Sequence, residues 1–204
     1  MSRRPSVRDR FRGEICGVGT TSGTRIVVGR WPESPFGSFA DVMVERADGH
    51  RVFLAPDDEI AAYVTSVYAF DEIVVAPVVT ERRVDALHVA GGPLELDATI
   101  GARDPLGWLL RTVPRRVATS TAWATVVDPI ARVAMRGVRT RGTTAGGDEY
   151  YAATDRHGVT AVVARWDGVD LGPLTDVDPP VRFGFSSTPR RPSIVAVTTT
   201  VRRR

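Results

Sequence analysis

The 204-residue chain contains no lysine, no asparagine and no glutamine, and all 27 of its basic residues are arginine. This bias is typical of a GC-rich genome, because the codons for lysine and asparagine are AT-rich. Without lysine the chain cannot form a side-chain Schiff base, supply a P-loop lysine or use a lysine general base. Composition alone therefore excludes several classes of enzyme mechanism.

Cysteine and histidine are scarce. Cys16 is the one cysteine, and the three histidines are His50, His88 and His157. One thiol cannot form an intramolecular disulfide, and none of the histidines stands in a recognised metal-binding spacing. The sequence also has no Gly-x-Ser-x-Gly elbow and no complete dinucleotide-binding fingerprint. We therefore expect neither a bound metal nor a cofactor.

Long apolar runs are absent as well. No segment reaches the 18 apolar residues of a membrane span, and the first residues, Met-Ser-Arg-Arg-Pro, lack the apolar stretch of a signal peptide. A single cysteine agrees with a reducing compartment. These features together predict a cytoplasmic protein.

The composition that is present is that of a globular domain, with 43% hydrophobic and 25% charged residues. A chain of this length can bury one substantial core. The formal net charge of +3 is unevenly distributed, since residues 1–12 carry a net +4 and residues 181–204 a net +6, which leaves residues 13–180 at −7. We predict a flexible basic tail over residues 1–12 and a single α+β domain over residues 13–204.

Short β-favouring segments with turn residues between them dominate the pattern. Pro56 with three acids after it predicts one short helix, and Asp104-Pro105 and Asp128-Pro129 each predict a helix start. The expected strands fall into two sets, residues 13–20, 25–30, 39–46, 51–54, 72–79, 84–90 and 94–100, then residues 137–143, 149–154, 160–166, 181–185 and 193–202. This order predicts a mostly antiparallel β-barrel, or paired curved sheets, with two or three helices between the two sets of strands.

Two segments are candidates for a ligand site. Residues 31–37, Trp-Pro-Glu-Ser-Pro-Phe-Gly, are typical of a loop that covers a barrel mouth, or of a surface loop packed on its own side chains. Residues 182–193 combine two phenylalanines with Arg182, Arg190 and Arg191, and guanidinium groups suit phosphate or carboxylate oxygens. The alternative for this second segment is a solvated loop between the last two strands.

The segment Asp155-Arg156-His157-Gly158 has two interpretations. The structural interpretation is a hairpin turn, in which Asp and His are ordinary turn-forming residues. An acid–base pair formed by Asp155 and His157 is the functional one.

Over nearly its whole length the chain resembles uncharacterised proteins of high-GC actinobacteria, in stretches such as residues 19–25, 31–39 and 177–184. Residues 34–42, Ser-Pro-Phe-Gly-Ser-Phe-Ala-Asp-Val, and the order of strands also resemble barrels of the acetoacetate decarboxylase type. That second resemblance implies a barrel with an internal cavity. The Schiff-base chemistry of that family does not carry over, because this chain has no lysine.

Three functional hypotheses follow. The first is a non-enzymatic barrel that binds a small anionic or amphipathic ligand, with Trp31, Phe36, Tyr68 and Trp166 as its apolar lining and Arg182, Arg190 and Arg191 as anion contacts. The second is an interaction module whose arginine-rich ends bind nucleic acid or an acidic protein. The third is an enzyme that uses His157 with Asp155. The sequence leaves the oligomeric state open.

Overall fold

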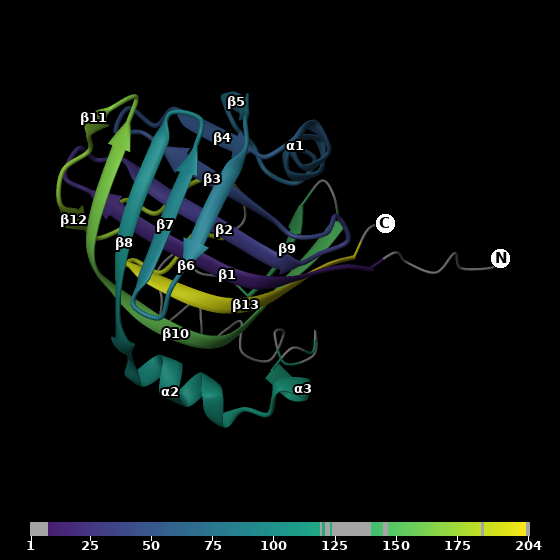
Figure 1. Cartoon of the computed structure of the whole chain (residues 1–204). Coiled ribbons are helices and arrows are strands. Elements are labelled where there is room, and N and C mark those ends of the chain that lie inside the picture. The colour runs from purple at the N-terminus through teal and green to yellow at the C-terminus, as the bar shows by residue number, and fades with distance from the viewer. Residues whose placement is uncertain are drawn as a thin grey trace.

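The computed structural model describes residues 8–118, 120, 123, 140–144, 147–184 and 186–202 (Figure 1). These residues form one sheet of thirteen strands and three helices. The strands before the helices are β1 (Arg8–Thr20), β2 (Arg25–Glu33), β3 (Phe39–Glu45), β4 (Arg51–Ala55), β5 (Glu72–Val75), β6 (Val78–Arg82), β7 (Ala86–Gly91) and β8 (Leu94–Arg103). The later strands are β9 (Arg141–Thr144), β10 (Gly147–Trp166), β11 (Val169–Asp170), β12 (Leu174–Thr175) and β13 (Ser193–Arg202).

The main path of the sheet runs β5-β4-β3-β2-β1-β13-β10-β8-β7-β6. Every neighbouring pair along it is antiparallel except β4 and β5. Because β13 lies between β1 and β10, the strands before and after the helices join into one curled sheet. The structure confirms the predicted α+β fold of mostly antiparallel strands.

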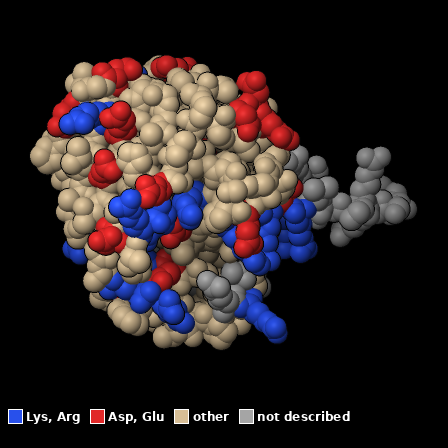
Figure 2. Space-filling model, in the orientation of Figure 1, with Lys and Arg blue, Asp and Glu red and all other residues tan. Residues whose placement is uncertain are grey.

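The pairing of β1 with β13 brings distant parts of the chain together. Arg8 lies opposite Arg202 at one end of this ladder. In the space-filling view, blue arginine atoms gather beside the described ends of these two strands, whereas acidic and basic residues are mixed over much of the same face (Figures 1 and 2).

The curl of the sheet depends on β10, a strand of 20 residues. Its first part pairs with β13 and its second part with β8. The pairing register shifts between Ala153 and Asp155, and again between His157 and Ala161. Such bulges bend a strand and increase its twist, so one strand can serve both sides of the fold.

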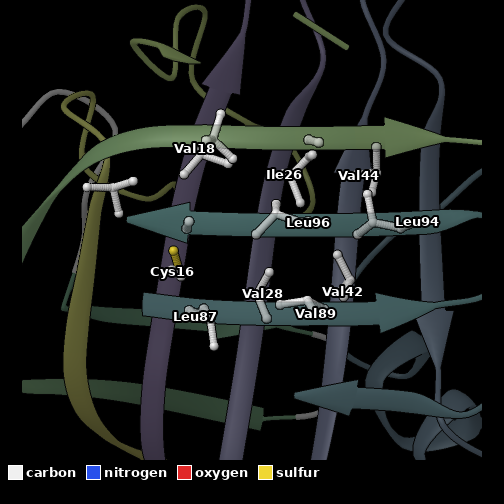
Figure 3. Close-up of a cluster of buried hydrophobic side chains, with 14 of the residues drawn as sticks. Cys16, Val18, Ile26, Val28, Val42, Val44, Leu87, Val89, Leu94 and Leu96 are labelled. Atoms are coloured by element: carbon white, nitrogen blue, oxygen red, sulfur yellow. The ribbon is translucent and has the colours of Figure 1, made fainter. Parts of the chain in front are cut away.

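The main core lies between the two sides of the folded sheet. In Figure 3 the strands β1, β2 and β3 cross β7, β8 and β10 at a steep angle, with apolar side chains packed between the two layers. These side chains include Cys16, Val18, Ile26, Val28, Val42, Val44, Leu87, Val89, Leu94 and Leu96. These side chains are almost completely buried, and the core that they form covers one face of the central strands.

The opposite face of the same strands carries the candidate site. Side chains alternate along a strand, so Ile26 and Val28 of β2 point into the core while Val27, Gly29 and Trp31 point to the other side. The helices α1 (Asp58–Thr65), α2 (Pro105–Thr112) and α3 (Arg115–Ala118) complete the described elements. Residues of α1 and α2 and of the segment before β13 lie over this second face.

The two longer helices begin where the sequence predicts. Asp57 caps α1 by accepting a hydrogen bond from the Ile60 backbone N–H at 2.8 Å, and Asp104 caps α2 in the same way through Gly107. Proline at the first position of α2 fits a site where no backbone donor is needed. No helix within the described residues is long and apolar enough to cross a membrane.

Several sequence-based boundaries need correction. Strand β1 begins at Arg8 and Phe11 is buried, so residues 8–12 belong to the sheet rather than to a basic tail. The segment from Asp155 to Gly158, expected as a turn, lies inside β10, where tertiary pairing on both sides overrides its turn-like composition. Residues 181–184, expected as a strand, are not strand. The helix expected to start at Asp128-Pro129 falls outside the described residues.

Candidate ligand-binding site

A cavity of about 550 Å³ lies between the second face of the central strands and the segments that cover it. The strands β1, β2, β3, β10 and β13 form its floor. Apolar side chains from these strands include Phe11, Ile15, Val27, Phe39, Met43, Val195 and Val197. The helices α1 and α2 and the segment before β13 add Val64, Leu106, Leu109, Leu110, Val181 and Phe183. The lining is therefore overwhelmingly apolar.

Asp41 is a buried carboxyl group on the cavity wall, only 4% exposed. Its Oδ1 accepts a hydrogen bond from the Trp31 indole N–H at 3.0 Å. Burial raises the pKa of Asp41 to about 7, although the hydrogen bond from Trp31 opposes this shift. Near neutral pH, Asp41 is thus divided between its protonated and ionised forms.

Gly29 explains how the bond between Trp31 and Asp41 fits on the surface of the paired strands β2 and β3. Gly29 lies directly opposite Asp41 in the pairing of β2 with β3, and Trp31 follows two residues later on the same face. A Cβ atom at Gly29 would lie 2.1 Å from Asp41 Oδ1 and 2.5 Å from Trp31 Nε1. The missing side chain leaves the space in which the indole reaches the carboxyl group.

A second polar group on the wall combines Glu149 of β10 with two tyrosines. The hydroxyl of Tyr68 donates to Glu149 Oε2 at 2.9 Å, the hydroxyl of Tyr151 donates to the same oxygen at 3.3 Å, and the two hydroxyls also contact each other. Burial raises the pKa of both tyrosines well above the ordinary value, and the Glu149 carboxylate raises it further. Both tyrosines are therefore neutral hydrogen-bond donors.

Arg156 is the one basic residue among the described residues of the lining. Its Nη1 lies 2.6 Å from Asp104 Oδ2, so the carboxylate that caps α2 also neutralises this arginine. The polar character of the cavity wall is consequently acidic, since its described carboxyl groups are those of Asp41 and Glu149 and its one described arginine is already paired with Asp104.

The structure brings only part of the predicted ligand set to this cavity. Trp31 and Tyr68 line it. Phe36 instead packs on Tyr63 with ring centroids 4.8 Å apart, outside the lining. Trp166 packs against the main core on the other side of the sheet, under the Arg46 guanidinium.

None of the three predicted anion contacts lines the cavity. Arg182 holds the buried Glu45, with its Nη2 2.9 Å from Oε1, and Arg190 pairs with Asp176 and Asp178. Arg191 is exposed. The arginines of this segment are thus used mainly for fixing the chain, and any role in binding an anion stays a prediction.

Asp41, Gly29, Glu149 and Tyr151 were not singled out from the sequence. A signal existed for Asp41, because alternation in β3 places it on the face opposite Val42 and Val44. Glu149 and Tyr151 reach the cavity through pairing with β13, which local sequence does not reveal.

The pair His157 and Asp155 has a structural environment. Asp155 accepts two hydrogen bonds from the Arg103 guanidinium, at 2.7 and 2.9 Å, and lies 3.8 Å from His157 Nε2. Burial alone would raise the pKa of Asp155, but the bonds from Arg103 lower it overall. Neither side chain lines the cavity, so the geometry gives little support to an acid–base role. Among the described residues, no cluster of three metal-ligating side chains occurs.

No family model matches the chain, and no curated protein sequence matches it. The actinobacterial resemblance therefore stays a prediction.

Solved structures similar to the chain include two of acetoacetate decarboxylase. The enzyme from Legionella pneumophila is 10% identical, with a TM-score of 0.47, and the match covers 100% of this chain and 88% of the enzyme. A second structure of acetoacetate decarboxylase is 8% identical, with a TM-score of 0.38 and the same coverage of both chains. Likenesses this distant carry no argument about what the present chain does.

Proposed function

We propose that the protein binds a small, mostly apolar molecule in the cavity above β1, β2, β3, β10 and β13. The observation that carries the proposal is the apolar cavity of about 550 Å³. Ligand sites typically span about 300–1,000 Å³ and combine a hydrophobic lining with a few placed polar groups. Here the polar groups are Asp41 and the cluster of Glu149 with two tyrosines.

Of the two ligand classes expected from the sequence, the amphipathic one fits this cavity better than the anionic one. The arginines expected to bind an anion lie elsewhere, and the wall carries carboxyl groups instead. An anionic ligand would meet like charge at an ionised Asp41. The proposal involves binding alone and no catalytic step.

Fluorescence titration with N-phenyl-1-naphthylamine, a neutral apolar dye, tests the proposal. The variant Val195→Phe places a larger ring into the cavity, whereas Val163→Phe makes the same change at an exposed position of β10. We expect saturable binding to the unaltered protein, at least tenfold weaker binding to Val195→Phe, and unchanged binding to Val163→Phe. Urea unfolding of all three proteins verifies that each is folded.

Two results would contradict the proposal. One is the absence of saturable dye binding to the unaltered protein. The other is equal affinity for the unaltered protein and a folded Val195→Phe variant, which would place the dye outside this cavity.

A further inference from the structure

We infer that the cavity selects an apolar molecule that carries a protonated amine, with Asp41 as the counter-ion of that amine. This inference rests on the proposed binding function and names the chemical class of the ligand. It follows from the position of Asp41 in the lining, its few partners and the charges around it.

Asp41 has fewer partners than a buried carboxylate requires. Among the described residues, Trp31 is the one side chain that donates a hydrogen bond to it, and no arginine or histidine forms an ion pair with it. A buried carboxylate without a cation or several donors is costly, so such groups are normally paired. By contrast, the buried Glu45 is contacted by both Arg25 and Arg182.

The neighbouring side chains fix Asp41 without neutralising it. The indole of Trp31 is a neutral donor, and Gly29 provides the space for its bond. This arrangement orients the carboxyl group on the cavity wall and leaves its charge uncompensated. A ligand ammonium group would supply the missing charge, while the apolar lining would hold the rest of the molecule.

The other titratable groups that face the cavity already have partners. From β10, Tyr151 and Glu149 bond to each other and to Tyr68, which follows α1. The remaining two are Tyr63 of α1, whose hydroxyl donates to Asp9 of β1, and Arg156 of β10, which pairs with Asp104 at the start of α2. No described basic residue therefore competes with a ligand amine for Asp41.

Binding of an amine is consequently linked to the ionisation of Asp41. Burial raises the pKa of this carboxyl group to about 7 in the free protein. A bound cation favours the carboxylate, so at pH values below 7 binding releases a proton, and affinity rises with pH until Asp41 is fully ionised. Affinity for a neutral molecule of the same shape should change little over this range.

Displacement of N-phenyl-1-naphthylamine by octylamine and by octanol, at pH 5.5 and pH 8.0, tests the inference on the full chain. Octylamine stays protonated at both values, so only the protein titrates. We expect octylamine to bind more tightly at pH 8.0 by on the order of tenfold, and octanol to bind equally at both.

Two matched variants assign the effect to one carboxyl group. Asp41→Asn keeps an oxygen that accepts from Trp31, and we expect it to remove the pH dependence for octylamine while octanol still binds. Glu149→Gln makes the same change at the other acidic residue of the wall and should retain the pH dependence. Calorimetry of the unaltered protein at pH 6.5, in two buffers of different ionisation enthalpy, should show proton release on binding octylamine.

The outcomes separate this inference from the proposal beneath it. If neither compound displaces the dye, the proposed binding function fails. If octanol displaces it but octylamine binding neither strengthens with pH nor releases a proton, the amine inference is overturned. The same holds if a folded Asp41→Asn variant keeps the pH dependence or Glu149→Gln loses it.

Discussion

Gly29 shows how one absent side chain can position two functional groups. Its Cα lies opposite Asp41, and the space that a Cβ would fill is crossed by the bond between Trp31 and Asp41. The nearest atoms belong to the buried carboxyl group of Asp41 and the half-buried indole of Trp31, and because these two groups are bonded to each other, neither can move away easily.

Replacing Gly29 by alanine should therefore destabilise the protein by about 1–3 kcal/mol, the usual cost of overpacking. Gly158→Ala is the matched control, because Gly158 also lies in a strand and no atom lies within 4 Å of a Cβ built there. Urea unfolding gives the free energy of each variant, and we expect Gly158→Ala to stay within about 0.5 kcal/mol of the unaltered protein. Equal effects at the two glycines would refute the packing argument.

Cys16 reports on the opposite face of the same strands. It is 1% exposed in the main core, and burial raises the pKa of its thiol to about 12, with the Glu14 carboxylate adding to the shift. The thiolate is the reactive form, so the folded protein should react very slowly with a disulfide reagent such as DTNB at pH 8. Reaction of one thiol per chain should become rapid above the urea midpoint, and rapid reaction without urea would show that β1 opens locally.

At the scale of elements, the segment before β13 is held to β3 by charge. Glu45 is fully buried and contacts Arg25 at 3.1 Å, and it also accepts from the backbone N–H and the guanidinium of Arg182. Removing one partner of a buried ion pair leaves an uncompensated charge.

Glu45→Ala should accordingly cost about 3–5 kcal/mol of unfolding free energy. Glu33→Ala removes a glutamate of a neighbouring strand whose pair with Arg12 is exposed, so its cost should be about 0–1 kcal/mol. Chemical denaturation of both variants measures the contrast. Similar small losses in both would mean that Glu45 is not essential for holding this segment.

The elements also show what local sequence can predict. Asp57 and Asp104 identify the starts of α1 and α2 because a cap needs only residues a few positions away. Asp155 to Gly158 was misassigned because its strand state depends on β13 and β8, whose pairing is distant in sequence. Local turn chemistry is weaker than pairing on both edges.

At the scale of the whole molecule, Asp41 links stability to pH. The pKa of its carboxyl group is 3.8 for an ordinary aspartate, which stands for the unfolded chain, and about 7 in the folded protein. As pH rises above 4 the unfolded chain loses this proton first, so the stability contributed by the raised pKa is present at low pH and lost as pH rises through 7.

Between pH 5 and pH 8, the free energy of unfolding of the unaltered protein should thus fall by about 3 kcal/mol relative to that of Asp41→Asn. Urea unfolding of both proteins at the two pH values gives the difference, in which the titration of other groups cancels. An unchanged difference would indicate that Asp41 is ionised throughout, with a cation beside it.

The candidate site was predictable only in part, because the whole fold brings its residues together from distant parts of the chain. Trp31 and Tyr68 were chosen as aromatic residues, and both line the cavity. The anion contacts were chosen because Arg182, Arg190 and Arg191 cluster in sequence. The direction of an arginine side chain, however, depends on which carboxylates the fold places nearby, as at Arg182 and Arg190. Glu149 faces Tyr68 across 81 positions of the chain, a proximity that only the assembled sheet creates.

The order of strands has a consequence for how the chain reaches its native state. Residues 193–202 form β13, which lies in the middle of the sheet between β1 and β10. Pairing of Arg8 with Arg202 closes a very long loop, and such distant contacts slow folding. During synthesis the two sides of the sheet must wait, with their inner edges open, until residues 193–202 have been made, so this interval is when the nascent chain is most exposed to aggregation.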